Sequence, residues 1–270
     1  MEQQELLKVC HLTKKFPGVV AVDDVSFDVR RGEVHVLIGE NGAGKSTMVK
    51  MIAGIYKSDG GSFILDGEPY DAQQHGVSMV HQELSMMPNR TVAQNIYSGR
   101  EPVKGGFIKR VDTKKMNSDS RALLEGLGVD VDPQELTKNL SIARQQMVEV
   151  AKATSTNNKV LILDEPTSSL TAPEIRALFE IIHRLKEQGV GIIYISHRMN
   201  EIFEIGDRIT VVRDGRYIGT KEVKNTDVDE IIRMMIGRNI GQLFNRTYQE
   251  PGKLLLETQE LTGLRFRNVS

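Results

Sequence analysis

At 270 residues with 39% hydrophobic side chains, the chain can bury the core of one large α/β domain or of two small ones. A formal net charge of −1 argues against a surface built to neutralise many nucleic-acid phosphates. The single cysteine, Cys10, excludes an internal disulfide and a cysteine-based metal site. No apolar run reaches the roughly 18 residues of a membrane span, and residues 1–8 lack the apolar core of a signal peptide. We therefore expect a cytoplasmic protein that contacts a membrane only through a partner.

The N-terminal stretch predicts two short strands, over residues 6–11 and 25–29, on either side of a loop over residues 12–20. Phe16 lies in this loop beside a Pro-Gly turn signal. Its ring could stack on a flat base, or it could fill the small core under the turn, and physics alone favours the second interpretation.

A glycine-rich stretch follows a buried strand expected over residues 34–38 and precedes a helix expected over residues 46–55. It fits the phosphate-loop pattern G-x-x-x-x-G-K-[ST], in which backbone N–H groups close around phosphate oxygens. Lys45 would reach the β- and γ-phosphates, the Ser46 hydroxyl would ligate Mg²⁺, and the helix N-terminus would add partial positive charge. The predicted nucleotide-binding residues are Gly39, Glu40, Asn41, Gly42, Ala43, Gly44, Lys45, Ser46 and Thr47.

Further strands are expected over residues 63–65 and 77–82. The second ends in Gln82, at the carboxyl edge where ligands collect in open α/β sheets. From there to about Val150 the pattern is mostly helical, with helices expected over residues 111–127 and 141–154 and no convincing strand between them. The sequence thus predicts an inserted helical subdomain over about residues 83–150.

A short apolar run over residues 160–163 predicts a strand that ends in Asp164 and Glu165. Two carboxylates at the end of a buried strand are costly unless a cation faces them. A Mg²⁺ ion beside the phosphate loop would supply that charge, with Asp164 towards the metal and Glu165 placed to orient or deprotonate a water. The alternative is a charge pair for the following helix, which already has a start signal in Thr171, Pro173 and Glu174.

The strand expected over residues 191–195 ends in Ser196 and His197. This histidine could contact a γ-phosphate, although alone it would more often be an ordinary, partly exposed histidine. The phosphate loop, Gln82, the carboxylate pair and His197 each follow a predicted strand, so one parallel sheet would bring all of them to one edge. That convergence predicts a nucleotide hydrolase.

The order and spacing of these motifs resemble the nucleotide-binding subunit of an ABC transporter over essentially the whole chain. The resemblance implies an α/β P-loop NTPase fold of the ABC type, with a mixed sheet core, an antiparallel β subdomain and an inserted α-helical subdomain. Within that family, Phe16 resembles the aromatic residue that stacks on adenine, and this reverses the interpretation from physics alone. Residues 168–171 resemble the D-loop.

The resemblance also assigns roles at the site. Gln82 matches the Q-loop glutamine, Asp164 the Walker B aspartate, Glu165 the catalytic glutamate and His197 the switch histidine. The implied catalytic residues are Glu165, Lys45, Gln82 and His197. The implied Mg²⁺ ligands are Ser46, Gln82 and Asp164.

Residues 140–146 read L-S-I-A-R-Q-Q where the family usually shows L-S-G-G-Q. Ile142 and Ala143 replace both glycines. In the family, this signature of one domain closes over the nucleotide held by the phosphate loop of another, in a head-to-tail pair. Side chains at these two positions would hinder the close approach of backbone to a γ-phosphate. We expect the composite site that uses this signature to be compromised, and the site that uses this phosphate loop to be intact.

The end of the chain echoes its beginning. Residues 255–262 are similar to residues 6–13, and Val269 and Ser270 correspond to Val25 and Ser26. We interpret residues 253–270 as the start of a second, truncated ABC domain, after a first domain over residues 1–240 and a linker over residues 241–252. The alternative is a coincidence between two amphipathic strands.

Tandem domains with this signature, and the segment over residues 231–238, resemble the monosaccharide-import branch of the family, whose members take up ribose, galactose, arabinose or xylose. The resemblance implies ATP and Mg²⁺ as cofactors and hydrolysis of ATP to ADP and phosphate. It implies membrane permease subunits and the second ABC domain as partners, a periplasmic or extracellular sugar-binding protein as an indirect one, and a place on the inner face of the cell membrane. We expect no nucleic-acid partner.

Two other functions compete with transport. The first is a soluble ABC ATPase that acts on ribosomes or nucleic acid, for which the same loop and carboxylates would serve; such proteins usually need basic surface, and this chain is close to neutral. The second is a regulatory nucleotide sensor that does not hydrolyse its ligand. Glu165 and His197 argue against the sensor.

Overall fold

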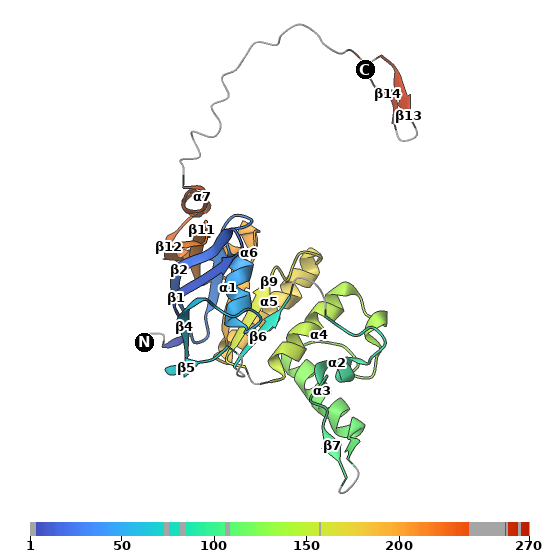
Figure 1. Cartoon of the computed structure of the whole chain (residues 1–270). Coiled ribbons are helices and arrows are strands. Elements are labelled where there is room, and N and C mark those ends of the chain that lie inside the picture. The colour runs from blue at the N-terminus through green and yellow to red at the C-terminus, as the bar shows by residue number, and fades with distance from the viewer. Residues whose placement is uncertain are drawn as a thin grey trace. The chain divides into compact units, whose positions relative to one another are not determined.

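The computed structural model describes residues 4–72, 76–81, 85–105, 109–156, 158–237, 257, 259–263 and 266–269. The chain divides into two compact units, Met1–Gly237 and Arg238–Ser270. Figure 1 shows the elements of each unit. No helix among the described residues is long and apolar enough to cross a membrane.

The core of the first unit is a six-stranded sheet in the order β12-β11-β3-β10-β9-β6. All neighbouring pairs from β11 to β6 are parallel, and β12 is antiparallel to β11. All residues of β3, β9 and β10 are buried, as expected for apolar strands covered on both faces. The strands are β3 (Val34–Ile38), β6 (Val77–Val80), β9 (Val160–Asp164), β10 (Gly191–Ile195), β11 (Arg208–Arg213) and β12 (Arg216–Glu222). The parallel core predicted from the sequence is confirmed.

A second sheet is antiparallel, in the order β2-β1-β4-β5. Its strands are β1 (Glu5–Phe16), β2 (Val19–Arg30), β4 (Gly60–Leu65) and β5 (Glu68–Tyr70). The expectation of a loop over residues 12–20 is wrong. Strands β1 and β2 pair as far as Phe16 and Val19, so that only Pro17 and Gly18 form the turn. The register shifts between Val9 and Leu12, and this irregularity breaks the alternation of buried and exposed residues that marks a strand in the sequence.

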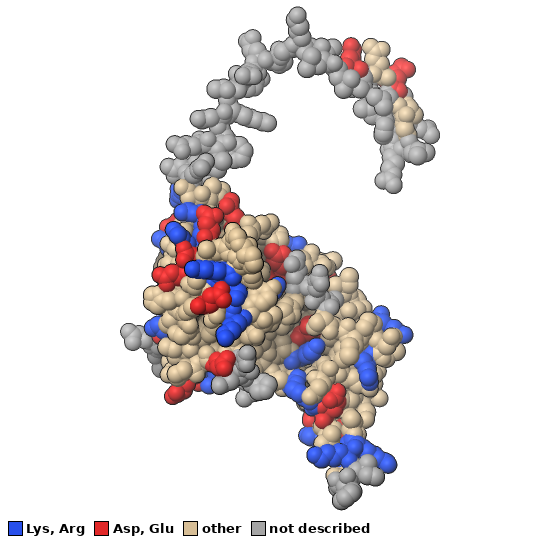
Figure 2. Space-filling view, in the orientation of Figure 1, with Lys and Arg blue, Asp and Glu red and all other residues tan. Residues whose placement is uncertain are grey.

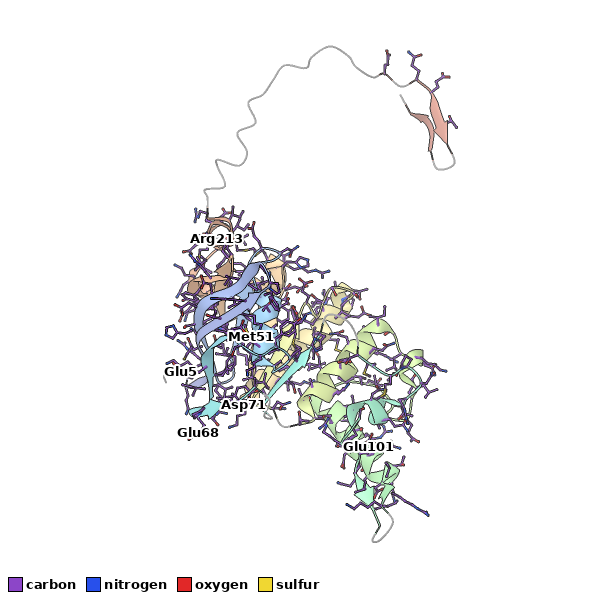
Figure 3. All side chains as sticks on the ribbon, viewed as in Figure 1. Glu5, Met51, Glu68, Asp71, Glu101 and Arg213 are labelled. Carbon is purple, nitrogen blue, oxygen red and sulfur yellow. The ribbon has the colours of Figure 1, made fainter. Side chains whose placement is uncertain are left out.

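Helix α1 (Lys45–Ile52) packs between the two sheets. Met51 of this helix, labelled in Figure 3, is fully buried. Alternate side chains of β10 point to opposite faces of the sheet. Ile193 and Ile195 pack with α1, whereas Ile192 and Tyr194 pack in the hydrophobic cluster on the other face. The face of the sheet that carries α1 is therefore distinct from the face that carries the helical subdomain.

The helical subdomain packs on that opposite face, and Figure 1 shows its helices gathered beside the core. It contains α2 (Val92–Ile96), α3 (Thr113–Leu127), the 3-10 helix η1 (Thr137–Asn139) and α4 (Ile142–Thr154). The sequence did not predict the short hairpin of β7 (Val103–Lys104) and β8 (Arg110–Val111). Val111 therefore belongs to a strand, and α3 begins after Asp112, whose side chain accepts a hydrogen bond from the Lys115 N–H at 3.1 Å.

Helix α5 (Ala172–Glu187) begins at the predicted capping box, where the Thr171 N–H and hydroxyl both donate to the Glu174 carboxylate at 2.7 Å. Helix α6 (Met199–Ile205), the 3-10 helix η2 (Val223–Asn225) and α7 (Val228–Ile236) complete the unit. Helices α6 and α7 cover β3 and β11 through Ile202 and Ile231. On the face shown in Figure 2, Lys and Arg side chains alternate with Asp and Glu, except for a basic tip at the end of the helical subdomain.

The described residues of the second unit include two antiparallel strands, β13 (Leu261–Gly263) and β14 (Phe266–Val269). Leu261 pairs with Val269. The predicted linker over residues 241–252 and the first residues of the predicted second domain, 253–256, lie outside the described residues.

Candidate functional site

The parallel strands place the predicted site residues at one edge of the sheet. The strand order β3-β10-β9-β6 makes neighbours of the phosphate loop after β3, His197 after β10, and Glu165 after β9. Gln82 follows β6 but lies outside the described residues. The predicted convergence is thus confirmed for every described member of the set.

The phosphate loop is closed by its own lysine. The Lys45 ammonium donates to the carbonyl oxygens of Gly39 at 2.8 Å and Glu40 at 2.9 Å. Gly44 sits in the left-handed region with φ +94°, and a Cβ there would lie 2.3 Å from the Ala21 carbonyl oxygen of β2. Only glycine satisfies both conditions. The shape of this loop is therefore fixed by Gly44 and by the two contacts of Lys45.

A cavity of about 470 Å³ lies over this loop, within the size range of ligand sites. Its lining combines the loop with Glu165 and with Ile195, the last residue of β10. The lining residues are Ala21, Asn41, Gly42, Ala43, Gly44, Lys45, Ser46, Thr47, Glu165 and Ile195. The loop and Glu165, which directly follows β9, therefore line the same space.

The pKa values of Lys45 and Asp164 are both shifted in the direction that favours the neutral side chain. Burial lowers the pKa of Lys45, and the carboxylates of Glu165 and Asp164 oppose that effect. Burial, and then the charge of Glu165, raise the pKa of Asp164, against a hydrogen bond from Ser46. Asp164 keeps only 8% of its surface exposed. A cation bound next to these carboxylates would relieve the cost of ionising Asp164.

The oxygen atoms at this site suit a magnesium ion that would be bound partly by the protein and partly by the phosphates of a nucleotide. Ser46 and Asp164 offer hard oxygen atoms and are already joined by a hydrogen bond. Among the described residues there is no group of three or more His, Cys, Asp or Glu side chains able to hold a metal ion. Mg²⁺ typically takes one or two protein ligands and completes its shell with phosphates and water. Gln82, the third predicted ligand, lies outside the described residues.

Glu165 and His197 face one another at the rim of the cavity. The Nδ1 atom of His197 lies 3.3 Å from Oε1 of Glu165. The backbone N–H of Glu165 donates to the Ile195 carbonyl at 3.0 Å, and its φ of +48° is rare for a residue with a side chain. The side chain of His197 is 70% exposed, whereas that of Glu165 is 25% exposed. Strained backbone of this kind clusters at functional sites.

Phe16 stands apart from this cavity. It ends β1 with 37% of its surface exposed, so it does not fill a core under the turn. Its ring contacts the edge of Tyr56 at a centroid distance of 5.9 Å, and the Lys14 ammonium lies 5.5 Å from the ring centre. It is not among the residues that line the cavity. Contact with adenine stays a prediction.

The signature segment caps a helix. The Ser141 hydroxyl accepts a hydrogen bond from the Arg144 N–H at 3.3 Å and so begins α4. Ile142 is 56% exposed, but Ala143 is 6% exposed and belongs to the core. The expectation that Ala143 obstructs a facing nucleotide is therefore wrong, because its methyl group points into the subdomain. Of the two side chains, only that of Ile142 lies at the surface, and its effect on a facing nucleotide stays a prediction.

The supports behind the phosphate loop had no signal in the sequence. Besides Ala21, the N–H of Gly215 in the β11–β12 turn donates to the Ala43 carbonyl at 3.2 Å. The Gly215 carbonyl in turn accepts from the Asp23 N–H at 2.8 Å. Because these residues come from strands far apart in the chain, no local pattern links them to the loop.

The chain is similar to known ATP-binding proteins. A family model described as ABC transporter matches residues 22–168. The chain is 49% identical over 267 residues to the ribose import ATP-binding protein of Geobacillus kaustophilus, covering 96% of this chain and 54% of the relative. It is 47% identical over 274 residues to the galactose/methyl galactoside import ATP-binding protein of Salmonella typhimurium, covering 98% of this chain and 54% of the relative. The chain spans about half the length of the curated relatives it matches.

Solved structures share the fold. The ADP conformation of an ATP-binding cassette of an ABC transporter superposes with a TM-score of 0.73 at 24% identity, covering 87% of this chain and 100% of that one. A subunit of a complex from Clostridium perfringens gives a TM-score of 0.72 at 22% identity, covering 89% and 98%. The predicted ABC-type α/β fold is confirmed. By its motifs, its fold and its relatives, this chain belongs to the ABC transporter family of ATP-binding proteins.

Proposed function

We propose that this chain binds ATP and hydrolyses it to ADP and phosphate, and that hydrolysis drives the import of a monosaccharide through membrane permease subunits. The observation that carries the proposal is the approach of His197 to Glu165 at 3.3 Å beside the cavity of the phosphate loop. A phosphate loop alone supports binding, whereas a carboxylate oriented by a histidine at the same cavity supports attack by water. The relatives are ATP-binding proteins for import of ribose and of galactose or methyl galactoside, and this supports a sugar as cargo.

Each site residue has a task in this reaction. The backbone of residues 39–47 and the Lys45 ammonium would bind the phosphates, and Phe16 would stack on adenine. Glu165 would orient and deprotonate the attacking water, with His197 holding the glutamate and contacting the γ-phosphate. Ser46, Asp164 and Gln82 would hold Mg²⁺, which neutralises the charge of the phosphates.

We also propose that residues 253–270 begin a second copy of the domain. Their described backbone repeats features of the first copy. Leu261 pairs with Val269 as Leu12 pairs with Val25, which are the positions that correspond in the sequence. The residues before these leucines, His11 and Glu260, both have positive φ, 52° and 47°.

A side-chain contact repeats as well. The Thr13 hydroxyl donates to the His11 carbonyl at 3.5 Å, and the Thr262 hydroxyl donates to the Glu260 carbonyl at 3.3 Å. The shared pairing, the unusual φ and this hydrogen bond at corresponding positions support the proposal that the two segments are copies of one unit. The second domain would supply the signature serine that closes over this phosphate loop, and the relatives are long enough to hold two such domains.

Coupling to the permease would run from the segment after Gln82 into the helical subdomain. Glu149 of α4 is 6% exposed, and its carboxylate accepts from the Ser85 N–H at 2.9 Å and from the Ser85 hydroxyl at 2.8 Å. This contact joins the segment after Gln82 to the helix that Ser141 begins. The protein would lie in the cytoplasm on the inner face of the membrane, with a periplasmic or extracellular sugar-binding protein as an indirect partner.

The two rival functions have less support. The relatives from Geobacillus kaustophilus and Salmonella typhimurium are import proteins, so they do not favour a soluble ATPase of ribosomes or nucleic acid. Capture of permease subunits, compared with capture of ribosomes, would separate these two functions. The contact between Glu165 and His197 argues against a sensor that never hydrolyses ATP.

Substitution of the catalytic carboxylate tests the reaction. In the full-length protein with its permease, Glu165→Gln should leave ATP affinity within about twofold and lower turnover by about a hundredfold or more, the usual contribution of a general base. Glu180→Gln, an exposed change on α5 with the same loss of charge, is the matched control and should retain full turnover. Turnover that survives Glu165→Gln would refute the proposal.

A concentration series tests the need for a second domain. The 270-residue chain should bind ATP but hydrolyse it slowly at every protein concentration, because Ile142 obstructs pairing of the chain with itself. Turnover that rises steeply with concentration would mean that two copies close over the nucleotide despite Ile142, and the role given to that side chain would be wrong.

A further inference from the structure

A buried carboxylate outside the predicted site joins the two segments that carry Glu165 and His197. Glu201 lies in the first turn of α6 with 5% of its surface exposed. Its Oε2 atom accepts hydrogen bonds from three hydroxyl groups, those of Thr167 at 2.8 Å, Tyr194 at 2.8 Å and Ser196 at 3.0 Å. Its Oε1 atom accepts from the Arg198 guanidinium at 3.1 Å.

The groups that donate to Glu201 come from the segment that carries Glu165 and from the segment that carries His197. Thr167 is two residues beyond Glu165, on the segment that leads into α5. Ser196 and Arg198 flank His197 directly, and the Arg198 N–H donates back to the Ser196 hydroxyl at 3.1 Å. The distance between Glu165 and His197 is therefore set by segments that meet at Glu201.

The cluster is well suited to hold a fixed geometry. Thr167, Tyr194 and Ser196 have 2%, 0% and 4% of their surfaces exposed, so water cannot replace the carboxylate as their acceptor. Burial and the charge of Glu201 raise the pKa of Tyr194, which keeps its hydroxyl protonated as a donor throughout the neutral range. Arg198 supplies the positive charge that a buried carboxylate needs.

We propose that Glu201 is a positioning residue that holds Glu165 and His197 at their working distance. This inference deepens the proposed ATPase function and rests on it. Glu201 does not line the cavity of the phosphate loop, so it would act on the rate of the chemical step and leave nucleotide affinity alone. Displacements of about 1 Å in a catalytic group can lower a rate by about a hundredfold.

The test is Glu201→Gln in the full-length protein with its permease, with Glu204→Gln as the matched control. Glu204 is an exposed glutamate on the same helix, and its substitution removes the same charge. We expect Glu201→Gln to lower kcat by about ten- to a hundredfold with KM and the stoichiometry of nucleotide binding unchanged. An unchanged kcat would overturn the proposal.

A double-substitution cycle separates positioning from simple loss of folded protein. In a His197→Ala background, with residual hydrolysis measured in single turnovers, Glu201→Gln should have much less effect, since the pair it positions is already broken. An effect of equal size in both backgrounds would mean that Glu201 only stabilises the fold. Should Glu201→Gln fail to fold, Thr167→Val and Tyr194→Phe can replace it, since each removes one hydrogen-bond donor to Glu201. Each should lower kcat by a smaller factor, and each should have much less effect in the His197→Ala background.

A measurement without turnover keeps this proposal distinct from the proposed function. In the nucleotide-free protein, Glu201→Gln should speed amide hydrogen exchange in residues 165–171 and 195–199 and leave residues 39–47 unchanged. If Glu201→Gln speeds exchange but the unsubstituted protein does not hydrolyse ATP, the proposed ATPase function is refuted and the role of Glu201 is not. Unchanged exchange in those two segments would refute the role of Glu201 alone.

Discussion

The phosphate loop contains two glycines in the left-handed region, and the structure predicts different results when each becomes alanine. Gly42 has φ +85°, and a Cβ added there would meet no atom within 4 Å. Gly44 has φ +94°, and its added Cβ would lie 2.3 Å from the Ala21 carbonyl oxygen and 3.4 Å from a Val22 methyl carbon. The two substitutions therefore share the backbone strain and differ in the steric contact.

The shared strain, an L-residue in the left-handed region, costs about 1–2 kcal/mol. The loss of backbone freedom in the unfolded chain is the same for both alanines and cancels in their difference. The contact of Gly44→Ala is with the backbone of β2, which is paired into a sheet and cannot move as a flexible side chain would. Overpacking of this kind costs about 1–3 kcal/mol. We therefore expect Gly44→Ala to lose about 1–3 kcal/mol more unfolding free energy than Gly42→Ala.

Urea unfolding of the nucleotide-free protein measures both values, with equal m-values as the sign that the unfolding reaction itself is unchanged. Nucleotide-free protein is needed because a side chain at Gly42 could meet a bound phosphate. If the two variants lose the same stability within about 0.5 kcal/mol, the contact between Gly44 and β2 does not constrain the loop, and our account of its shape is wrong.

Two further predictions concern pH. Because burial and the charge of Glu165 raise the pKa of Asp164 above 3.8, ionisation of Asp164 destabilises the fold as pH rises through that raised value. Nucleotide-free Asp164→Asn should therefore be more stable than the parent at neutral pH and lose this advantage below pH 3.8, as measured by urea midpoints. An advantage that persists in acid would contradict a raised pKa of Asp164 in the folded protein. At the opposite end of the sheet, the Arg208 guanidinium donates to both oxygens of Asp28 at 2.8 and 2.9 Å, and its hydrogen bond is the main cause that lowers the pKa of Asp28 below 3.8. Burial opposes ionisation of Glu33, but His35, the Arg30 N–H and Arg208 outweigh it and keep the pKa of Glu33 below 4.5. Arg208→Met should thus lower the unfolding free energy by about 3 kcal/mol at neutral pH. This loss should shrink as acid protonates both carboxylates, and a loss that does not change with pH would refute the pairing of Arg208 with them.

The sequence determined those parts of the protein whose cause is local. The phosphate loop, the strands β3, β9 and β10, and the capping box of α5 each follow from residues that are adjacent or a few positions apart. Parallel neighbouring strands have their carboxyl ends at the same edge of the sheet, and this is why the convergence of Glu165 and His197 could be predicted from the sequence alone.

Only the tertiary structure decided contacts between segments that are distant in the chain. Strands β1 and β2 extend through the expected loop because they pair with each other around a bulge, which no single-strand pattern reveals. Which of Ile142 and Ala143 faces outward depends on how α4 packs against its neighbours. From the sequence alone, Glu201 is an ordinary acidic residue in the first turn of a helix. It becomes the junction of the catalytic segments only because the sheet order brings Thr167, Tyr194 and Ser196 to its carboxylate, and that order is a property of the whole fold.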